Sequence, residues 1–245
     1  MIDFGGGVRT GEGKCLVVAE LGCNHNGDLG TAVRLVKECA AAGADVIKFQ
    51  LYTLNEILDL RGEAGPVPAP WADKAKSMRE LYVKARTPSE WLPVLRTACE
   101  QEGVPWFSSV FGQESLAYLE WLGCPVYKVA ALDTGSDSLQ AQVRATDKPI
   151  IASHPTHRVE WADLTLWCPP GYPQEWGAFR WPDDGMSKLH LDGLSFHGTS
   201  LNAVLCAVEY GVGLIEVHVQ LDDEPSYLDA HSSLTVSQLK ELCNA

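Results

Sequence analysis

Two histidines stand at the ends of two similar apolar runs. His197 closes the run that starts at Leu191, and His218 lies 21 residues later in the run that starts at Leu214. If both runs are strands joined by a helix, they form a βαβ unit, and both imidazoles lie at the same rim of a parallel sheet. Such folds carry their chemistry at that rim. Because imidazole is the commonest protein ligand of a catalytic divalent metal, the pair predicts a metal site. The alternative is two hydrogen-bonded histidines of the core.

Two lysines lie inside other apolar runs. Lys48 stands in Val-Ile-Lys-Phe-Gln, where it shares a strand face with Gln50, and Lys128 stands in Val-Tyr-Lys-Val-Ala. An ammonium group is costly to bury unless it meets an anion. Two such lysines near a rim predict a phosphate or carboxylate site. The interpretation that stays open beside it is that each lysine neutralises a core carboxylate, such as Glu20 or Glu216.

The elements that must position these residues follow a regular alternation. Eight runs predict strands: Cys15–Leu21, Val46–Tyr52, Trp106–Phe111, Val126–Ala130, Pro149–Ser153, Leu164–Cys168, Leu191–His197 and Leu214–Gln220. Helical patterns separate them, at Asp28–Ala42, Ser89–Glu102, Gln113–Leu122, Ser138–Thr146, Leu201–Tyr210 and Val236–Leu242. Strands that alternate with helices indicate a parallel sheet, and eight strands indicate a TIM (β/α)8 barrel.

Two connections depart from the regular unit. Ten residues separate Ser153 from Leu164, and they include Pro155, so the crossover helix after the fifth strand is expected to be missing. The stretch 169–181, rich in Trp and Pro, predicts irregular structure with one short helix around 174–179. Apart from these departures, the chain of 245 residues is expected to form a single compact barrel domain, residues 1–245.

Composition excludes several classes of partner. A net charge of −13 without a basic run argues against a nucleic acid, and no apolar stretch is long enough to span a bilayer. With no secretory signal, we expect a cytoplasmic protein whose eight dispersed cysteines stay reduced. The chain has no GxxxxGK[ST] loop and no GxGxxG after its first strand, which disfavours a nucleotide-binding core. The remaining histidines are weaker candidates and are expected to be solvated: His25, His154, His157, His190 and His231.

Five motifs together resemble the sialic acid synthase family. They are Ala-Glu-Leu-Gly-Cys-Asn-His-Asn-Gly at 19–27, Gly-Ala-Asp-Val-Ile-Lys-Phe-Gln at 43–50, Val-Tyr-Lys at 126–128, Gly-Leu-Ser-Phe-His at 193–197 and Glu-Val-His at 216–218. The resemblance runs from about residue 14 to 243, over the barrel domain without the family's antifreeze-like C-terminal domain. It implies a phosphoenolpyruvate-dependent transferase that joins this substrate to an aldose. The aldose would be N-acetylmannosamine or a related amino sugar, and the products a nonulosonic acid and phosphate.

The resemblance also implies roles for single residues. The metal ligands would be His197 and His218, holding manganese or magnesium. The positions that match the binding of phosphoenolpyruvate are Lys48, Ser109, Lys128, Ser153 and Ser195. The positions that match sugar contact or proton transfer are Glu20, Gln50, Asp133, Tyr172 and Asp229, where Asp133 replaces the family's glutamate.

Some positions depart from the family pattern. Ala131 replaces a serine, His154-Pro155 stands in place of Thr-Gly, and Pro170 replaces an asparagine. The partners implied are the two small-molecule substrates and a second copy of the chain in a homodimer. Two alternatives remain open: a non-catalytic barrel that serves as a binding or assembly subunit, and an aldolase that acts on another sugar with Lys128 as Schiff-base former.

Overall fold

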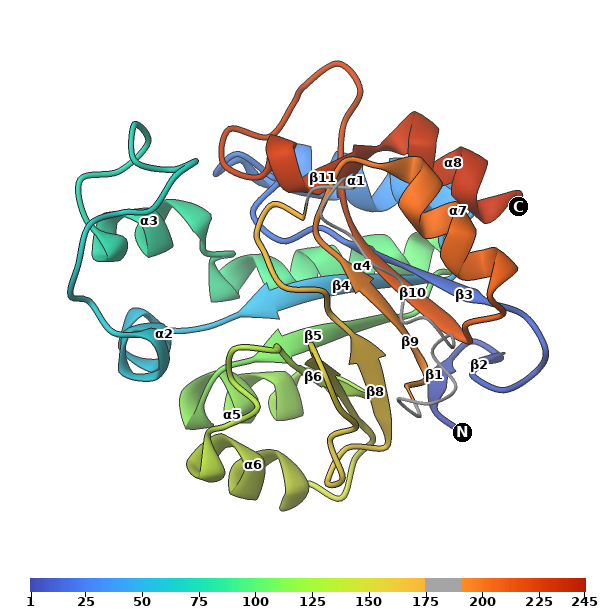
Figure 1. The fold of residues 1–245 in the computed structure, drawn as a ribbon, viewed down its shortest axis with the longest axis horizontal. Helices are drawn as coiled ribbons and strands as arrows, with labels where there is room; N and C mark the ends of the chain where they lie inside the picture. The colour runs from blue at the N-terminus through green and yellow to red at the C-terminus, as the bar shows by residue number, and fades with distance from the viewer. Residues whose placement is uncertain (175–190) are drawn as a thin grey trace.

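The core of the molecule is a closed barrel of eight parallel strands (Figure 1). The computed structural model describes residues 1–174 and 191–245. The barrel strands are β3 (Leu16–Glu20), β4 (Val46–Leu51), β5 (Trp106–Val110), β6 (Tyr127–Val129), β7 (Ile150–His154), β8 (Leu164–Trp167), β9 (Gly193–Phe196) and β10 (Leu214–Gln220). Each strand pairs with the next along the chain, and β10 pairs with both β9 and β3, which closes the sheet. The predicted TIM barrel is confirmed.

The barrel strands are found where the apolar runs predict them because both of their faces are buried. Every residue of β3, β5 and β10 is buried, inward against the barrel interior or outward against helices. A strand buried on both faces reads as a nearly continuous apolar run. The polar residues that interrupt these runs, such as Lys48 and Glu216, are therefore buried inside the molecule.

Helices cover the outside of the barrel. The predicted ones are α1 (Leu29–Ala42), α4 (Leu92–Glu102) with the short η1 (Ser89–Trp91) before it, α5 (Gln113–Trp121), α6 (Asp137–Arg144), α7 (Leu201–Glu209) and α8 (Val236–Cys243). In α1, the Asp28 side chain accepts from the Thr31 N–H, and Gly43 ends the helix with a φ of 101°. Leu35, Val36 and Cys39 of α1 are fully buried.

One crossover helix is missing, as predicted. Residues 155–163 join β7 to β8 without a helix. The Asp163 carboxylate accepts from the Ile150 N–H at 2.8 Å, which fixes the end of this connection against the start of β7. The short helix predicted around 174–179 lies, beyond residue 174, outside the described residues.

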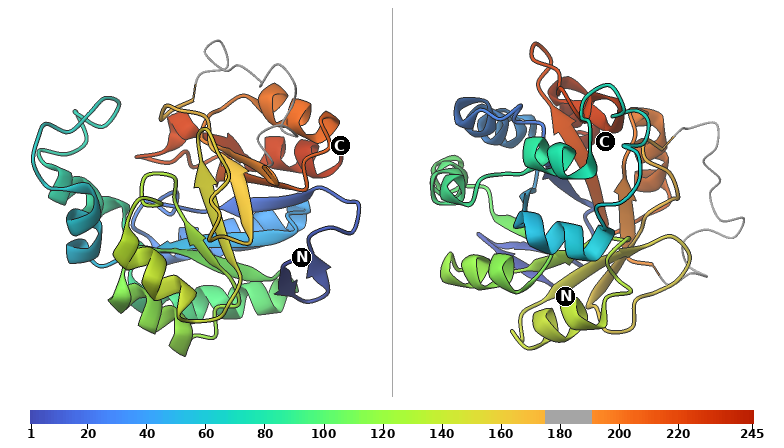
Figure 2. Two further views of the ribbon diagram at one scale, coloured as in Figure 1. Left: turned by 60° about the horizontal axis from the view of Figure 1, so that its bottom comes forward. Right: turned by 90° about the vertical axis from the view of Figure 1, so that its left-hand side faces the viewer.

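The connection between β4 and β5 holds two helices that the sequence analysis did not predict. They are α2 (Leu54–Arg61) and α3 (Met78–Ala85), and we call residues 54–85 the α2–α3 segment. Figure 1 shows it at the end of the barrel toward which β4 points. In the right-hand view of Figure 2, which looks from that side, α2 lies in front of the strands. The segment therefore stands at the carboxyl ends of the strands, where a TIM barrel has its active site.

The other end of the barrel is closed by the N-terminal hairpin of β1 (Asp3–Gly5) and β2 (Val8–Arg9). The Phe4 ring lies 5.3 Å from the Phe107 ring of β5. A short strand, β11 (Ser233–Thr235), follows η3 (Ala230–Ser232) and extends the sheet beside β10. All eight cysteines are free thiols, as predicted. Within residues 1–174 and 191–245, no helix has the length and apolar character to cross a bilayer.

Candidate active site

The register of the parallel strands brings the predicted residues together. Glu20 of β3 lies beside Lys48 of β4 on one side and beside His218 of β10 on the other. Ser109 of β5 lies beside Lys128 of β6. Paired residues of neighbouring parallel strands point to the same face, which here is the barrel interior. These five predicted residues thus line the inside of the barrel near its carboxyl end in two groups, which the hydrogen bond from Lys48 to Ser109 joins.

Lys48 is the centre of a buried charge network. Its ammonium group forms an ion pair with Glu20, lies 3.5 Å from Glu216 and donates to the Ser109 hydroxyl at 3.0 Å. Burial opposes the charged form of Lys48, but the two carboxylates outweigh it and raise its pKa. Burial also raises the pKa of Glu20, with the Glu216 carboxylate adding to the effect. Glu20 is therefore a carboxyl group that takes up a proton more readily than an exposed one.

Lys128 is the second buried cation of the network. It donates to the Ser153 hydroxyl at 2.6 Å and lies 3.8 Å from Glu216. Burial would raise the pKa of Glu216, but the two lysines outweigh it and lower that pKa to about 2. Burial lowers the pKa of Lys128, because only one of its neighbours, Glu216, is a close carboxylate. The sequence analysis left open that the lysines contact core carboxylates, and these contacts are present. The same lysines also donate hydrogen bonds to the predicted serines.

The two histidines lie side by side at the edge of this network, with their ring planes tilted by 57°. The ring centres of His197 and His218 are 4.9 Å apart, and the Ser195 hydroxyl lies 3.3 Å from His197 Nε2 and donates to Glu216 at 2.8 Å. The Nδ1 atoms of both histidines are buried and have no hydrogen-bond partner among residues 1–174 and 191–245. Burial lowers the pKa of each imidazole to about 3, so both rings are neutral, the form that binds a metal.

Tyr172 covers the histidine pair on the outer side. Its ring centre lies 5.0 Å from that of His197 and 6.1 Å from that of His218, and its hydroxyl donates to Asp229 at 3.1 Å. Asp229 Oδ2 is in turn 3.5 Å from His218 Nδ1. Burial raises the pKa of Asp229. Among residues 1–174 and 191–245, no group of three or more His, Cys, Asp or Glu converges as a metal site, so the histidine pair supplies two ligands at most.

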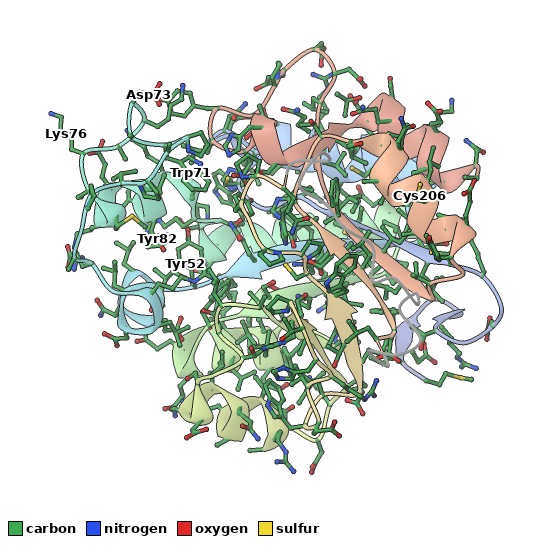
Figure 3. The ribbon with its side chains drawn as sticks, in the orientation of Figure 1. Tyr52, Trp71, Asp73, Lys76, Tyr82 and Cys206 are labelled. Atoms are coloured by element: carbon green, nitrogen blue, oxygen red, sulfur yellow. The ribbon has the colours of Figure 1, made fainter. Side chains whose placement is uncertain are left out.

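Trp71 of the α2–α3 segment packs on Tyr172 from outside. The two ring centres are 5.5 Å apart, and the indole N–H of Trp71 donates to the Leu228 carbonyl at 3.0 Å. His231 borders the same cluster, with its ring centre 5.4 Å from that of Trp71. In Figure 3, Trp71 lies between the barrel and the outer part of the segment, which Asp73 marks. The segment therefore covers the histidine pair from outside.

Two predicted residues, Gln50 and Asp133, contact the α2–α3 segment and not the charge network. The Gln50 amide donates to the Ala85 carbonyl at the end of α3, at 3.3 Å. Asp133 forms an ion pair with Arg61, at the end of α2, with 2.8 Å between Nη2 and Oδ2. Both residues lie at the carboxyl end of the barrel, on the side that the α2–α3 segment covers.

A cleft of about 460 Å³ adjoins the site on the outer side of the loop after β3. Cys23 and Leu228 line it, together with Arg86 and Trp91 from the chain after α3. Cys23, which lines this cleft, is hydrogen-bonded to Asp229, and Asp229 Oδ2 lies 3.5 Å from His218 Nδ1.

The expectation that His25 is solvated is wrong. It is 2% exposed, because its Nδ1 accepts from the Gly27 N–H at 3.0 Å and its ring lies 5.2 Å from that of Trp91. Burial lowers its pKa to about 4. His25 thus fixes the loop after β3 and has no place among candidate ligands.

Three central residues are absent from the predicted set. Glu216 lies between both lysines, and its place two residues before His218 on a strand already indicated a shared face. Arg61 and Trp71 come from the α2–α3 segment. The capping pairs Thr53–Glu56 and Ser77–Glu80 were the available signals for its helices, but no sequence pattern shows that these two side chains reach the mouth of the barrel.

Comparisons with known proteins agree with this architecture. The chain is 30% identical over 250 residues to pseudaminic acid synthase of Campylobacter jejuni, covering 95% of this chain and 73% of that protein. It is 31% identical over 254 residues to pseudaminic acid synthase of Helicobacter pylori, covering 94% and 72%. N-acetylneuraminate-9-phosphate synthase of Homo sapiens is 24% identical over 258 residues, covering 95% and 69%.

A solved structure shows the same fold. The sialic acid synthetase of Leptospira borgpetersenii, crystallised with citrate, superposes with a TM-score of 0.77 at 22% identity, covering 98% of this chain and 85% of that one. The NeuB family model matches residues 35–160 and 186–245. The predicted kinship with sialic acid synthases, and with it the prediction of a synthase-type enzyme, is confirmed: this chain belongs to the NeuB family.

Proposed function

We propose that this protein condenses phosphoenolpyruvate with an aldose, N-acetylmannosamine or a related amino sugar, to give a nonulosonic acid and phosphate. The observation that carries the proposal is the pair of buried lysines, Lys48 and Lys128, each bonded to a serine hydroxyl beside two neutral histidines. The relatives named above as pseudaminic acid and sialic acid synthases support the same class of product.

The lysines and hydroxyls suit a small substrate with several negative charges. The Lys48–Ser109 and Lys128–Ser153 pairs lie on four adjacent strands, β4 to β7. One anion with a carboxylate and a phosphate can therefore engage both pairs. Glu20 forms an ion pair with Lys48, and Glu216 lies 3.5 Å from Lys48 and 3.8 Å from Lys128, so two carboxyl groups face the two ammonium groups. Because the strands fix these donors, they bind the departing phosphate without rearrangement.

The histidine pair fits a divalent metal ion, manganese or magnesium. Two buried Nδ1 atoms without hydrogen-bond partners lie on adjacent rings, which leaves other coordination positions to substrate and water. A metal ion bound there would polarise the aldehyde of the acceptor. Ser195 is hydrogen-bonded to Glu216 and lies against His197, so it links the metal side of the site to the charge network.

The chain's own carboxyl groups handle protons. The enol carbon of phosphoenolpyruvate bonds to the aldehyde carbon, the aldehyde oxygen gains a proton, and water adds at the phosphate-bearing carbon before phosphate leaves. Burial raises the pKa of Glu20 and of Asp229, so either group holds a proton more readily than an exposed carboxyl group and can give and take one in the reaction. Glu20 forms an ion pair with Lys48 and pairs with His218 in the sheet, and Asp229 lies 3.5 Å from the same His218, so both carboxyl groups stand beside the histidine pair.

Phosphate release tests the proposal. With manganese, phosphoenolpyruvate and N-acetylmannosamine or other acetamido sugars, the protein is expected to release phosphate that keeps the bridging oxygen, which an ¹⁸O label reports. His197→Ala is expected to lower the rate by about three orders of magnitude or more and to weaken manganese binding measured by calorimetry. His157→Ala, which changes an exposed ring, is the control. Wild-type protein with bound metal that releases no phosphate across the sugar panel would refute the proposal.

A second candidate is an aldolase that uses Lys128 as a Schiff-base former. The observation in its favour is the lowered pKa of Lys128, because an amine must be neutral to attack a carbonyl. Borohydride trapping with keto sugars and keto acids decides between the two: covalent labelling at Lys128 favours the aldolase. The homodimer and the cytoplasmic location stay predictions, and light scattering after size-exclusion chromatography checks the first.

A further inference from the structure

One ion pair fastens the α2–α3 segment to the barrel. Arg61, the last residue of α2, donates from Nε to Asp133 Oδ1 at 3.2 Å and from Nη2 to Asp133 Oδ2 at 2.8 Å. The Asp133 side chain is 0% exposed and that of Arg61 24%. The two residues are 72 positions apart, so the pair joins the end of α2 to the loop after β6.

The surroundings of the pair hold it in one geometry. Arg61 Cζ lies 5.4 Å from the centre of the Phe111 ring, and Tyr82 is hydrogen-bonded to the guanidinium. The Asp133 N–H donates to the Ala130 carbonyl at 2.9 Å, which fixes the loop that carries the carboxylate. Figure 3 shows Tyr82 next to Tyr52, where α3 meets the end of β4. Both partners are thus held by neighbours besides each other.

A bidentate contact of this kind determines what the carboxylate can do. An arginine side chain keeps its charge at any ordinary pH, and the planar fork holds both oxygens of an ionised carboxylate. Each oxygen keeps a second lone pair that can accept another hydrogen bond. Because the fork already engages both oxygens, Asp133 is held in place to accept further hydrogen bonds.

We propose that Arg61 is a positioning residue that holds Asp133 as a hydrogen-bond acceptor for hydroxyl groups of the acceptor sugar. The inference rests on the proposed function and changes one expected role: Asp133 binds the acceptor, while proton transfer belongs to other carboxyl groups. This arrangement recognises an acceptor sugar that places neutral hydroxyl donors next to the Asp133 carboxylate.

Comparison with Glu20 supports this division of roles. Glu20 shares its ion-pair partner, Lys48, with Glu216, and it lies on a strand inside the charge network. Asp133 has a guanidinium to itself and lies on a loop at the mouth. Carboxyl groups in such different environments take different roles in one site.

The position of Asp133 indicates that it serves the acceptor and not phosphoenolpyruvate. The anion-binding pairs Lys48–Ser109 and Lys128–Ser153 lie within the barrel on its strands, whereas Asp133 lies four residues beyond the end of β6. Gln50 also turns away from the network, to the carbonyl of Ala85 in the α2–α3 segment. The segment thus borders the outer part of the site, which a second substrate must enter.

Steady-state kinetics of three variants test the inference: Arg61→Gln, Asp133→Asn and the double variant. Each is expected to raise the KM for the acceptor by about tenfold or more, with kcat and the KM for phosphoenolpyruvate changed by less than about threefold. The double variant is expected to be no worse than either single one, because the residues act as a unit. The pH profile of kcat is expected to keep its wild-type shape in all three.

Arg79→Gln is the matched control. Arg79 makes the same two-point contact with Glu63, at 2.6 and 3.0 Å, within the same segment, but both side chains are about half exposed. Its kinetics are expected to equal those of the wild type. Arg61→Lys is expected to recover part of the acceptor KM lost in Arg61→Gln, because it restores the charge without the fork.

Several results would overturn the inference. A fall in kcat with loss of one limb of the pH profile in Asp133→Asn assigns proton transfer to Asp133. An equal rise in both KM values, together with a lower urea midpoint, assigns the pair a purely structural role. Phosphoenolpyruvate binding, measured by calorimetry without acceptor, separates a failure of this inference from a failure of the proposed function. Wild-type protein that neither binds phosphoenolpyruvate nor releases phosphate refutes the proposed function.

Discussion

The inner and outer parts of the site are built in different ways. The inner part consists of side chains on strands, such as Lys48, Lys128 and Glu216, which the register of a closed sheet sets side by side. The outer part consists of loop residues, such as Asp133 and Tyr172. These are held by contacts with the α2–α3 segment, through Arg61 and Trp71.

The two parts differ in how readily their residues can be replaced. A buried charge on a barrel strand has partners on both neighbouring strands, so changing one residue leaves another charge unpaired. A loop residue at the mouth has fewer obligatory partners, and its neighbours come from segments that differ in length and sequence. The inner part thus suits a substrate with a fixed charge pattern, and the outer part suits the substrate that distinguishes one synthase from another.

The strongest test of this comparison is to remove one charge from the inner part. Lys48→Met leaves Glu20 and Glu216 buried together without their shared cation. We expect the free energy of unfolding to fall by about 3 to 5 kcal/mol, measured by urea denaturation at neutral pH. The loss is expected to shrink at lower pH, because the raised pKa of Glu20 lets it become neutral there.

Arg79→Met is the control for the Lys48 prediction. It removes a cation from an exposed pair, and the urea midpoint is expected to stay at the wild-type value. If Lys48→Met also keeps the wild-type midpoint, the inner part is not a closed charge network and the contrast with the outer part fails.

The same contrast decides what the sequence could reveal. All eight barrel strands were predictable, because strands buried on both faces carry continuous apolar runs, and Lys48 was conspicuous as a charge within one. The missing helix after β7 was predictable from the short connection with Pro155. Even the row of Glu20, Lys48 and His218 follows from strand alternation once the sheet is known to close.

The outer part could not be derived in this way. Asp133 entered the prediction through the family resemblance alone, and its partner Arg61 is 72 residues away in the chain. That contact depends on how the barrel curves to bring the loop after β6 near the end of α2. Trp71 follows Pro66, Pro68 and Pro70 in a stretch without periodic pattern, where nothing local indicates which way the side chain points.

His25 tests whether an outer loop can be as firmly built as a strand. Burial lowers its pKa from the ordinary histidine value of 6.5 to about 4. As the pH falls, the unfolded chain therefore takes up a proton before the folded protein does. The stability that is present above pH 6.5 is lost progressively toward pH 4. From about pH 7 to about pH 5 this one group lowers the free energy of unfolding by about 2 kcal/mol.

His25→Gln is expected to remove that part of the pH dependence, measured by urea denaturation at the two pH values. His157→Gln, at an exposed ring, is expected to keep the wild-type dependence. A His25→Gln protein whose stability falls as steeply as that of the wild type would show that the ring is solvated in solution and that the loop after β3 is loosely held.

Tyr172→Phe makes the smallest change, because it keeps the ring over His197 and removes one hydroxyl from Asp229. The expected result is a fall in kcat/KM for the acceptor of about 5- to 10-fold, the equivalent of about 1 kcal/mol for one hydrogen bond. Manganese affinity and the KM for phosphoenolpyruvate are expected to stay unchanged, since the imidazoles and lysines keep all their contacts. Isothermal calorimetry and steady-state kinetics measure the three quantities on one protein sample. A loss of manganese affinity as large as the loss of kcat/KM would place Tyr172 with the inner part of the site, because the hydroxyl would then act on His218 through Asp229 and not on the acceptor.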